Sequence, residues 1–331
     1  MENTELLTRI YYNERIIKTF SKEKEKEYLK MYLLIFFVIL FVIIIFFIAN
    51  YIDGPRYLKI GECSLGKLET EYREKKKVKN CIISLTTTPA RISEIRPILA
   101  SLLDQSVAVE EIRINVPYTS CKGVPYKIPK WLKRLQNVKI YRQIKDWGPA
   151  TKLIPSLLDK QNKDKRIIVL DDDVIYGYNT VETLVEYFDK YNYKIKNGKK
   201  IRRKRKTAIT MYGDAIKDNM STDNGLYTRI TNYVEGDCFT DLLRGHSGYI
   251  VTPDMFTEEL YDYGKLPKEC FFVDDNYFSA HLKKNNVKIL MAGLSYKAIP
   301  LPEIVTCQLS PLHQTENHDN NNEKIVNKLI L

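Results

Sequence analysis

Three consecutive aspartates, Asp171 to Asp173, follow the apolar run Ile167 to Leu170 without a break. Carboxylates this close repel one another, and a nearby cation would relieve the repulsion. Mg²⁺ and Mn²⁺ take oxygen ligands and commonly bridge one or two carboxylates to a substrate's phosphates. The pattern therefore predicts a divalent metal site at the end of a buried strand, where the metal would neutralise a departing diphosphate. A surface turn or an acidic helix N-terminus is the structural alternative.

A second acidic pair, Asp274 and Asp275, opens the stretch 274–284. A carboxylate can act as a general base by removing the proton of an attacking hydroxyl. The same pair would also suit the N-terminus of a helix, where the helix dipole favours negative charge. The sequence alone leaves both interpretations of this pair open.

Strand and helix patterns alternate around these acidic stretches. A helix is expected to begin at Thr88, with Pro89 in its first turn, and to run to residue 105 with a kink or break at Pro97. Further helices are expected at 148–158, 181–191 and 274–284, and strands at 80–85, 111–117, 137–141, 166–170, 207–212, 247–251 and 287–291. This alternation predicts an α/β fold, with a mostly parallel sheet covered by helices on both faces. Ligands of such sheets bind beyond the carboxyl ends of the strands, where the three aspartates are expected.

A membrane anchor is predicted at 32–50, because 17 apolar residues run unbroken from Leu33 to Ala49. No small-residue cleavage pattern follows, which argues against a signal peptide. Lysines are more frequent before this segment than after it, so the positive-inside rule predicts a cytosolic tail (1–31) and a type II, single-pass topology. Residues 51–79 would then form a stem, 80–312 a catalytic domain and 313–331 a polar C-terminal tail.

The net charge and the cysteines give weaker indications of function than the acidic motifs do. The net charge is +11, and the run Lys194 to Lys206 holds nine Lys or Arg and no acid. We expect a solvated loop there, with binding to acidic lipid or another polyanion as the functional alternative; nucleic acid is not expected on the lumenal side. The six cysteines contain no CxxC pair, which argues against a zinc ribbon. A disulfide between Cys238 and Cys270 and glycosylation at Asn219 stay open.

Two enzyme classes fit an apolar strand that ends in Asp-x-Asp. In haloacid-dehalogenase-type phosphatases the first aspartate, here Asp171, attacks phosphorus, and 271–275 would supply the later acidic pair. The nucleophile strand normally opens that domain, whereas at least three strands and two helices come first here. A third possibility is a catalytically inactive lumenal binding protein.

The second enzyme class is glycosyl transfer from a nucleotide sugar. Five stretches, in this order, resemble family-2-like glycosyltransferases of the GT-A fold, in the nucleotide-diphospho-sugar transferase superfamily: 81–105, 146–153, 167–174, 244–256 and 271–289. The resemblance covers roughly 80–295. An anchor with a stem is also the usual layout of secretory-pathway glycosyltransferases. The resemblance implies a metal-dependent, inverting enzyme that uses Mn²⁺ or Mg²⁺ and moves a sugar from a nucleotide diphosphate sugar to a hydroxyl of a glycan, protein or lipid.

The resemblance also assigns roles to residues. Asp171 and Asp173 would hold the donor's ribose and the metal, and Asp275 would be the base, although Asp274 stands where Glu is usual. The other residues expected at the nucleotide sugar are Thr86, Thr87, Thr88, Arg91, Asp146, Lys152 and Asp172. The residues expected on the acceptor side are Trp147, His246 and Gly248, with His246 and His313 as further metal candidates.

Overall fold

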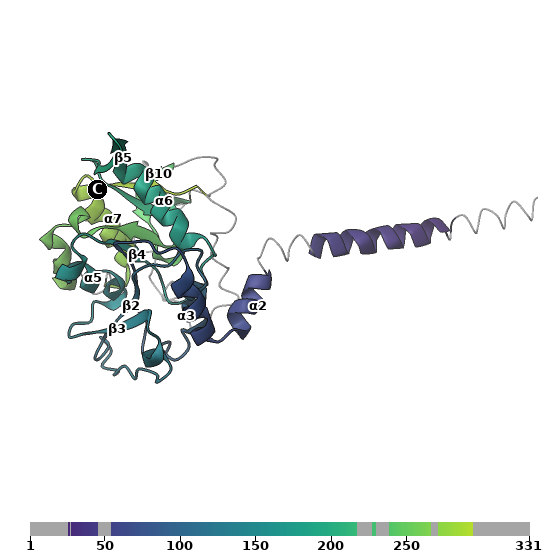
Figure 1. Cartoon of the computed structure of the whole chain (residues 1–331), viewed down its shortest axis with the longest axis horizontal. Coiled ribbons are helices and arrows are strands. Elements are labelled where there is room, and N and C mark those ends of the chain that lie inside the picture. The colour runs from purple at the N-terminus through teal and green to yellow at the C-terminus, as the bar shows by residue number, and fades with distance from the viewer. Residues whose placement is uncertain are drawn as a thin grey trace, which may run out of the picture. The chain divides into compact units, whose positions relative to one another are not determined.

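The structure, a computed structural model, describes residues 26, 28–45, 54–216, 227–229, 238–265 and 271–293 (Figure 1). Asn219, Cys270, Cys307 and His313 lie outside these residues, as does the tail 313–331. The disulfide and glycosylation predictions, and the weaker metal candidate His313, therefore stay predictions. The chain divides into two compact units, Met1–Tyr57 and Leu58–Leu331.

The first unit contains one long apolar helix, Tyr28–Ile45, with a mean hydropathy of 2.8 and no buried residue (purple in Figure 1). At about 1.5 Å per residue, these 18 residues extend over roughly 27 Å, close to the thickness of a hydrocarbon core. The helix is compatible with a single-pass membrane anchor by length and composition. A signal sequence near an N-terminus would pass the same test, and the orientation across a membrane stays a prediction.

The second unit is built on an eight-stranded sheet with the order β10–β13–β7–β12–β4–β1–β2–β3. Neighbours are parallel in the pairs β1–β2, β1–β4, β2–β3 and β7–β13, whereas β12 is antiparallel to both β4 and β7. The strands are β1 Cys81–Leu85, β2 Glu111–Pro117, β3 Val138–Gln143, β4 Arg166–Val169, β7 Thr207–Thr210, β10 Cys238–Thr240, β12 Tyr249–Val251 and β13 Lys288–Met291. The expected α/β fold with a mostly parallel sheet is confirmed, and each of the seven expected strands is present.

Two smaller sheets complete the strand inventory of the described residues. One has the order β11–β8–β9 and the other is a two-stranded hairpin. Their strands are β5 Tyr193–Lys196, β6 Lys199–Arg202, β8 Gly213–Ile216, β9 Tyr227–Arg229 and β11 Leu242–Leu243.

Helices and short 3₁₀ turns connect the strands, and α6 packs on β7 and β12 while α7 packs on β13. The α-helices of this part of the chain are α2 Gly54–Glu62, α3 Leu65–Glu74, α4 Arg96–Leu103, α5 Ile154–Leu158, α6 Thr180–Asn192 and α7 Asp274–Lys284. The 3₁₀ turns are η1 Leu132–Arg134, η2 Gly148–Lys152, η3 Lys160–Asn162, η4 Gly245–Ser247, η5 Pro253–Met255 and η6 Glu258–Lys265.

Two expected helices are shorter than the apolar pattern predicts, and proline explains both. The helix expected from Thr88 begins only at Arg96, because Pro97 takes a position in its first turn, and residues 89–94 form turns instead. The helix expected at 148–158 divides into η2 and α5, with Pro155 in the first turn of α5. Proline lacks the N–H that would continue the preceding turn.

Part of the expected stem is folded against the sheet domain. Helix α3 begins at its N-cap Ser64, whose Oγ accepts a hydrogen bond from the Lys67 amide (3.3 Å). Leu68 and Tyr72 of α3 are fully buried, and the Tyr72 hydroxyl accepts a hydrogen bond from the Val109 amide (2.8 Å). The compact unit thus begins before residue 80, although the functional division into stem and catalytic domain stays a prediction.

The basic run is a β-hairpin, so the expected loop is wrong, although its expected exposure to solvent is correct. Strands β5 and β6 pair in antiparallel fashion from Tyr193 opposite Arg202 to Lys196 opposite Lys199. Asn197 and Gly198 connect them with φ of +52° and +73°, the left-handed values of a two-residue type I′ turn. Asn-Gly is the sequence signal that could have predicted this turn.

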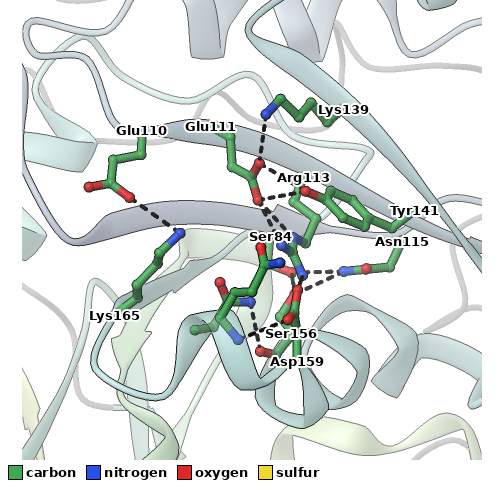
Figure 2. A network of polar contacts seen from close by, with 12 residues as sticks. Ser84, Glu110, Glu111, Arg113, Asn115, Lys139, Tyr141, Ser156, Asp159 and Lys165 are labelled. Atoms are coloured by element: carbon green, nitrogen blue, oxygen red, sulfur yellow. Dashed lines mark hydrogen bonds and ion pairs between the residues drawn. The ribbon is translucent and has the colours of Figure 1, made fainter.

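A buried ion-pair network lies on strand β2, and we refer to Glu111, Arg113, Tyr141 and Asp159 as the Arg113 network (Figure 2). The Arg113 guanidinium donates from Nε and Nη2 to Glu111 Oε1 (2.9 and 2.8 Å) and from Nη1 to Asp159 Oδ2 (2.8 Å). Its centre lies 3.7 Å from the centroid of the Tyr141 ring. All three guanidinium nitrogens are therefore paired inside the domain.

Uncharged polar side chains extend from this network towards the carboxyl ends of the strands (Figure 2). Asn115 Nδ2 donates to Ser84 Oγ (3.0 Å) and to Ser156 Oγ (3.1 Å), and Ser84 Oγ donates to the carbonyl of Lys152 (2.5 Å). The buried polar groups of β1 and β2 thus fix the backbone of Lys152.

Candidate active site

The three aspartates form a tight turn directly beyond strand β4. The amide of Asp171 donates to the hydroxyl of the fully buried Tyr176 (2.7 Å), which folds the turn back on itself. The side chain of Asp172 is buried, whereas those of Asp171 and Asp173 are 26% and 33% exposed. The turn therefore presents two carboxylates to solvent and keeps the middle one inside.

Arg91 is the cation beside Asp172 and Asp173. Its Nη1 lies 2.6 Å from Asp172 Oδ1 and 3.1 Å from Asp173 Oδ2, and its own side chain is buried. Burial raises the pKa of Asp172 to about 6, although the Arg91 charge acts in the opposite direction. Arg91 was expected at the nucleotide; the structure places it against the aspartate turn.

Lys152 connects the aspartate turn to the start of α7, and we refer to Lys152, Asp171, Asp274 and Asp275 as the Lys152 cluster. Its Nζ lies 2.8 Å from Asp171 Oδ1, 3.0 Å from Asp274 Oδ2 and 3.4 Å from Asp275 Oδ1. The Lys152 side chain is only 5% exposed. Burial alone would lower the pKa of this amine, but the three carboxylates raise it well above its usual value. The side chain is therefore a permanent cation.

The two acids of α7 differ in their electrostatic surroundings. Burial raises the pKa of Asp274 to about 7, against the opposing effect of Lys152. Burial also opposes ionisation of Asp275, but the Lys152 charge and a hydrogen bond from the Gly245 amide (2.8 Å) lower its pKa below the usual value. Asp275 is thus held as a carboxylate, and Asp274 titrates close to neutrality.

Gly245 was not singled out from the sequence, yet it lies against the centre of this cluster. A β-carbon at this position would meet Lys152 Nζ at 2.5 Å, Asp275 Oδ1 at 3.0 Å and Asp171 Oδ1 at 3.2 Å. The close approach of its backbone therefore requires glycine. Because β12 is antiparallel to β4, the residues just before β12 return to the carboxyl end of β4, which explains how Gly245 reaches the cluster.

The three residues expected on the acceptor side differ from one another in burial and in their contacts. His246 is exposed, and its ring centroid lies 5.2 Å from that of Tyr212. Gly248 has a φ of +92°, and a β-carbon there would lie 2.6 Å from Leu170 Cδ2, so this glycine has a backbone role. Trp147 is buried, with the Lys145 ammonium 3.4 Å from its ring centroid. Contact with an acceptor stays a prediction for all three.

Several residues expected at the nucleotide make hydrogen bonds within the domain. Asp146 accepts from the amides of Gly148 (2.8 Å) and Cys121 (2.5 Å), so its carboxylate fixes two loops to each other. Thr86 Oγ1 donates to the carbonyl of Asn115 (2.8 Å), which ties the end of β1 to β2.

The neighbouring threonines also have partners. Thr88 Oγ1 accepts from the Arg91 amide (3.3 Å), and the Thr87 carbonyl accepts from the Tyr126 hydroxyl (2.9 Å). Tyr126 was not found from the sequence, since it lies in an irregular stretch without periodic pattern. These contacts position the loop after β1, and nucleotide binding by its residues stays a prediction.

The two half-buried carboxylates of the aspartate turn suit a divalent cation. Asp171 and Asp173 offer hard oxygen donors, and in each carboxylate the structure pairs one oxygen with a cation of the protein. Burial and the charge of Asp171 raise the pKa of Asp173, a repulsion that a bound cation would relieve. Among the described residues, no group of three or more His, Cys, Asp or Glu could hold a metal alone. Asp171 and Asp173 would supply part of the oxygen ligands of a divalent ion.

Comparison with known proteins gives a distant structural likeness. No protein-family profile matches the chain, and no curated protein sequence matches it. Among solved structures, it is similar to a crystal structure of GalNAc-T7 with UDP, GalNAc and Mn²⁺, with a TM-score of 0.44 and 15% identity. The match covers 75% of this chain and 47% of that chain, about half of its length. A likeness at this distance bears on neither activity nor substrate.

Proposed function

We propose that the chain is a GT-A-like glycosyltransferase that moves a sugar from a nucleotide diphosphate sugar to a hydroxyl acceptor. The observation that carries the proposal is the Lys152 cluster. Lys152 Nζ lies within 3.4 Å of carboxylates from both the aspartate turn and α7. By resemblance, these two segments bind the donor and supply the base. The sheet brings them together at the carboxyl ends of its strands, where α/β folds bind ligands.

The aspartate turn forms the donor half of the proposed site. Asp171 and Asp173 would hold a Mn²⁺ or Mg²⁺ ion, which neutralises the charge of the departing diphosphate when bound. Arg91 keeps the turn in place through Asp172 and Asp173, and Lys152 adds a fixed positive charge beside Asp171. This half would orient the donor by charge.

The start of α7 forms the acceptor half. Asp275 would accept the proton of the acceptor hydroxyl while that oxygen attacks the anomeric carbon, with inversion. The Gly245 amide and Lys152 keep Asp275 ionised and fix its orientation. Asp274, whose pKa is higher, is the second candidate for this role, and it lies deeper in the domain.

The location follows from the apolar helix Tyr28–Ile45. We propose a type II membrane protein whose catalytic domain lies in the lumen of an endoplasmic reticulum or Golgi-like membrane, or outside the cell. The greater number of lysines before the helix than after it supports this orientation.

The test is donor turnover by the full chain in detergent with Mn²⁺. A panel of nucleotide sugars would be screened for release of nucleotide diphosphate, with and without EDTA. We expect turnover of one donor and its loss in Asp173→Asn. Asp164→Asn is the matched control, because Asp164 is 83% exposed and, among the described residues, pairs only with Lys163 at 4.0 Å.

Other outcomes would replace the proposal. Phosphate release from a phosphomonoester, lost in Asp171→Asn, would indicate a phosphohydrolase with Asp171 as nucleophile. Strands β1, β2 and β3 precede β4, which does not fit the usual strand order of that class. Donor binding without turnover, unchanged in Asp173→Asn and Asp275→Asn, would indicate an inactive binding protein.

A further inference from the structure

The basic hairpin β5–β6 is attached to the domain through one of its two faces. Residues directly opposite each other in an antiparallel pair share a face, so Lys200 and Arg202 lie on the same side as Tyr193. Lys200 forms an ion pair with Asp189 of α6 (2.7 Å), and Arg202 forms one with Asp254 of η5 (2.9 Å). These contacts make the hairpin a fixed element of the fold.

The other face carries three lysines without a described partner. Lys194 is paired with Ile201, and Lys196 is directly opposite Lys199. All three lysines are exposed, and none makes a hydrogen bond or ion pair within the described part of the chain. Like charges directly opposite each other destabilise a strand pair. An anion at this face would relieve that repulsion.

One apolar side chain lies among these cations. Ile201 is 40% exposed and shares the face of the three lysines, whereas Ile195, 72% exposed, lies on the face of Lys200. An aliphatic side chain surrounded by lysines fits the boundary between headgroups and acyl chains, where the cations meet phosphate and the apolar group leaves water. An acidic protein surface would satisfy the lysines and leave Ile201 without an apolar environment.

The hairpin lies at the opposite end of the strands from the candidate active site. Helix α6 begins shortly after the aspartate turn, and the hairpin directly follows its end at Asn192 and precedes the start of β7 (Figure 1). This surface is therefore separate from the proposed catalytic chemistry, and the inference shares with the proposed function only the membrane anchor, with anionic lipid in the leaflet that faces the domain.

We propose that the face formed by Lys194, Lys196, Lys199 and Ile201 binds the anionic phospholipid headgroups of a membrane. Each lysine close to a negatively charged bilayer adds to the electrostatic free energy of binding. This attraction falls away within a Debye length, so the binding is sensitive to salt. The apolar helix Tyr28–Ile45, if it is an anchor, keeps a bilayer within reach and raises the effective concentration of headgroups.

Hydrogen exchange of the full chain in liposomes tests this proposal. The chain would be reconstituted in phosphatidylcholine alone and in phosphatidylcholine with phosphatidylserine, and exchange would be followed in peptides that cover 193–202. We expect phosphatidylserine to slow exchange of the hairpin amides by about tenfold, and high salt to remove that protection. Exchange in α6 reports in the same experiment whether the domain is folded.

Two triple variants with equal loss of charge separate this surface from general charge effects. Replacing Lys194, Lys196 and Lys199 by Gln should abolish the protection. Replacing Lys122, Lys127 and Lys130 by Gln, in an exposed loop after β2, should leave it intact. Because the hairpin lysines have no described partner, we expect the first variant to fold, and Lys199→Glu gives a second, single-site test.

Two results would overturn the proposal. One is equal exchange of the hairpin in both lipid compositions. The other is protection by a soluble polyanion such as heparin without protection by phosphatidylserine, which would assign the surface to a polyanionic partner.

Discussion

The Arg113 network and the Lys152 cluster both place a cation among carboxylates inside the domain. They differ in how completely the negative charge of the carboxylates is neutralised. In the Arg113 network, the guanidinium uses all three nitrogens on two carboxylates, Tyr141 covers its face, and Lys139 lies 3.5 Å from Glu111 as a second cation. In the Lys152 cluster, one ammonium serves three carboxylates from two distant segments. The first is satisfied within the protein, and the second keeps an excess of negative charge.

This difference indicates what each group of residues is for. A buried ion pair with every donor satisfied fixes neighbouring strands, and its loss leaves a buried charge without a partner. An excess of carboxylates is costly for the folded protein alone and is useful when a cation or a proton arrives from outside. We therefore expect substitutions in the Arg113 network to affect stability and those of the carboxylates in the Lys152 cluster to affect transfer.

The largest expected effect is that of Asp275→Asn on transfer. Loss of the proposed base should lower kcat by about 10³-fold, with little change in the free energy of unfolding. The comparison variant is Asp159→Asn in the Arg113 network, which should retain most of its turnover. Equal losses of kcat in the two variants would contradict the division between the two regions.

The next effect is that of Arg113→Met on stability. Asp159 would lose its cation and Glu111 would keep only the exposed Lys139, so we expect the free energy of unfolding to fall by about 3–4 kcal/mol in urea denaturation. Arg134→Met is the control, because Arg134 is exposed and should change stability by less than about 0.5 kcal/mol. A small change in Arg113→Met would show that the network is not important for stability.

Lys152→Met should destabilise the protein by about 2 kcal/mol, and Mn²⁺ should recover part of this loss. The physical reason is that a divalent ion can take over part of the charge that Lys152 neutralises at Asp171. Thermal denaturation with Mn²⁺ and with EDTA would measure the recovery. Mn²⁺ should not change the Tm of Arg113→Met. A rise in the Tm of that variant with Mn²⁺ would contradict the proposed difference between the Arg113 network and the Lys152 cluster.

The smallest effect concerns pH. The folded-state pKa of Asp274 is raised to about 7, so the folded protein binds this proton more tightly than the unfolded chain does. Its contribution to stability is fully present below the ordinary Asp pKa and is lost as the pH rises through about 7. Asp274→Asn should remove this loss. We expect the Tm of the protein, relative to that of the variant, to fall between pH 6 and pH 8.

Strands were the most predictable part of the fold. Apolar runs bounded by turn residues placed all seven expected strands, because a strand buried on both faces leaves a continuous apolar pattern. Helix starts were less predictable, since Pro97 and Pro155 override the apolar period. The hairpin β5–β6 was missed because its strands are lysine-rich and exposed, and only Asn197 and Gly198 carried a signal.

The candidate site was predictable only in its acids. Asp171 to Asp173 and the pair Asp274–Asp275 stand out by their order along the chain. The burial of Lys152, and the close approach of Gly245 to the Lys152 cluster, follow from tertiary contacts between segments that are far apart in sequence. No local pattern distinguishes a buried lysine from a solvated one.

The antiparallel strand β12 also affects the order in which the domain can assemble during synthesis. It is the only described strand that joins β4 to β7, and it is made after both of them. Until residues 249–251 leave the ribosome, β4 has an unpaired edge, which in a nascent chain can pair with other strands. A stalled chain that ends before residue 249 should therefore bind holdase chaperones more strongly than one that has passed it.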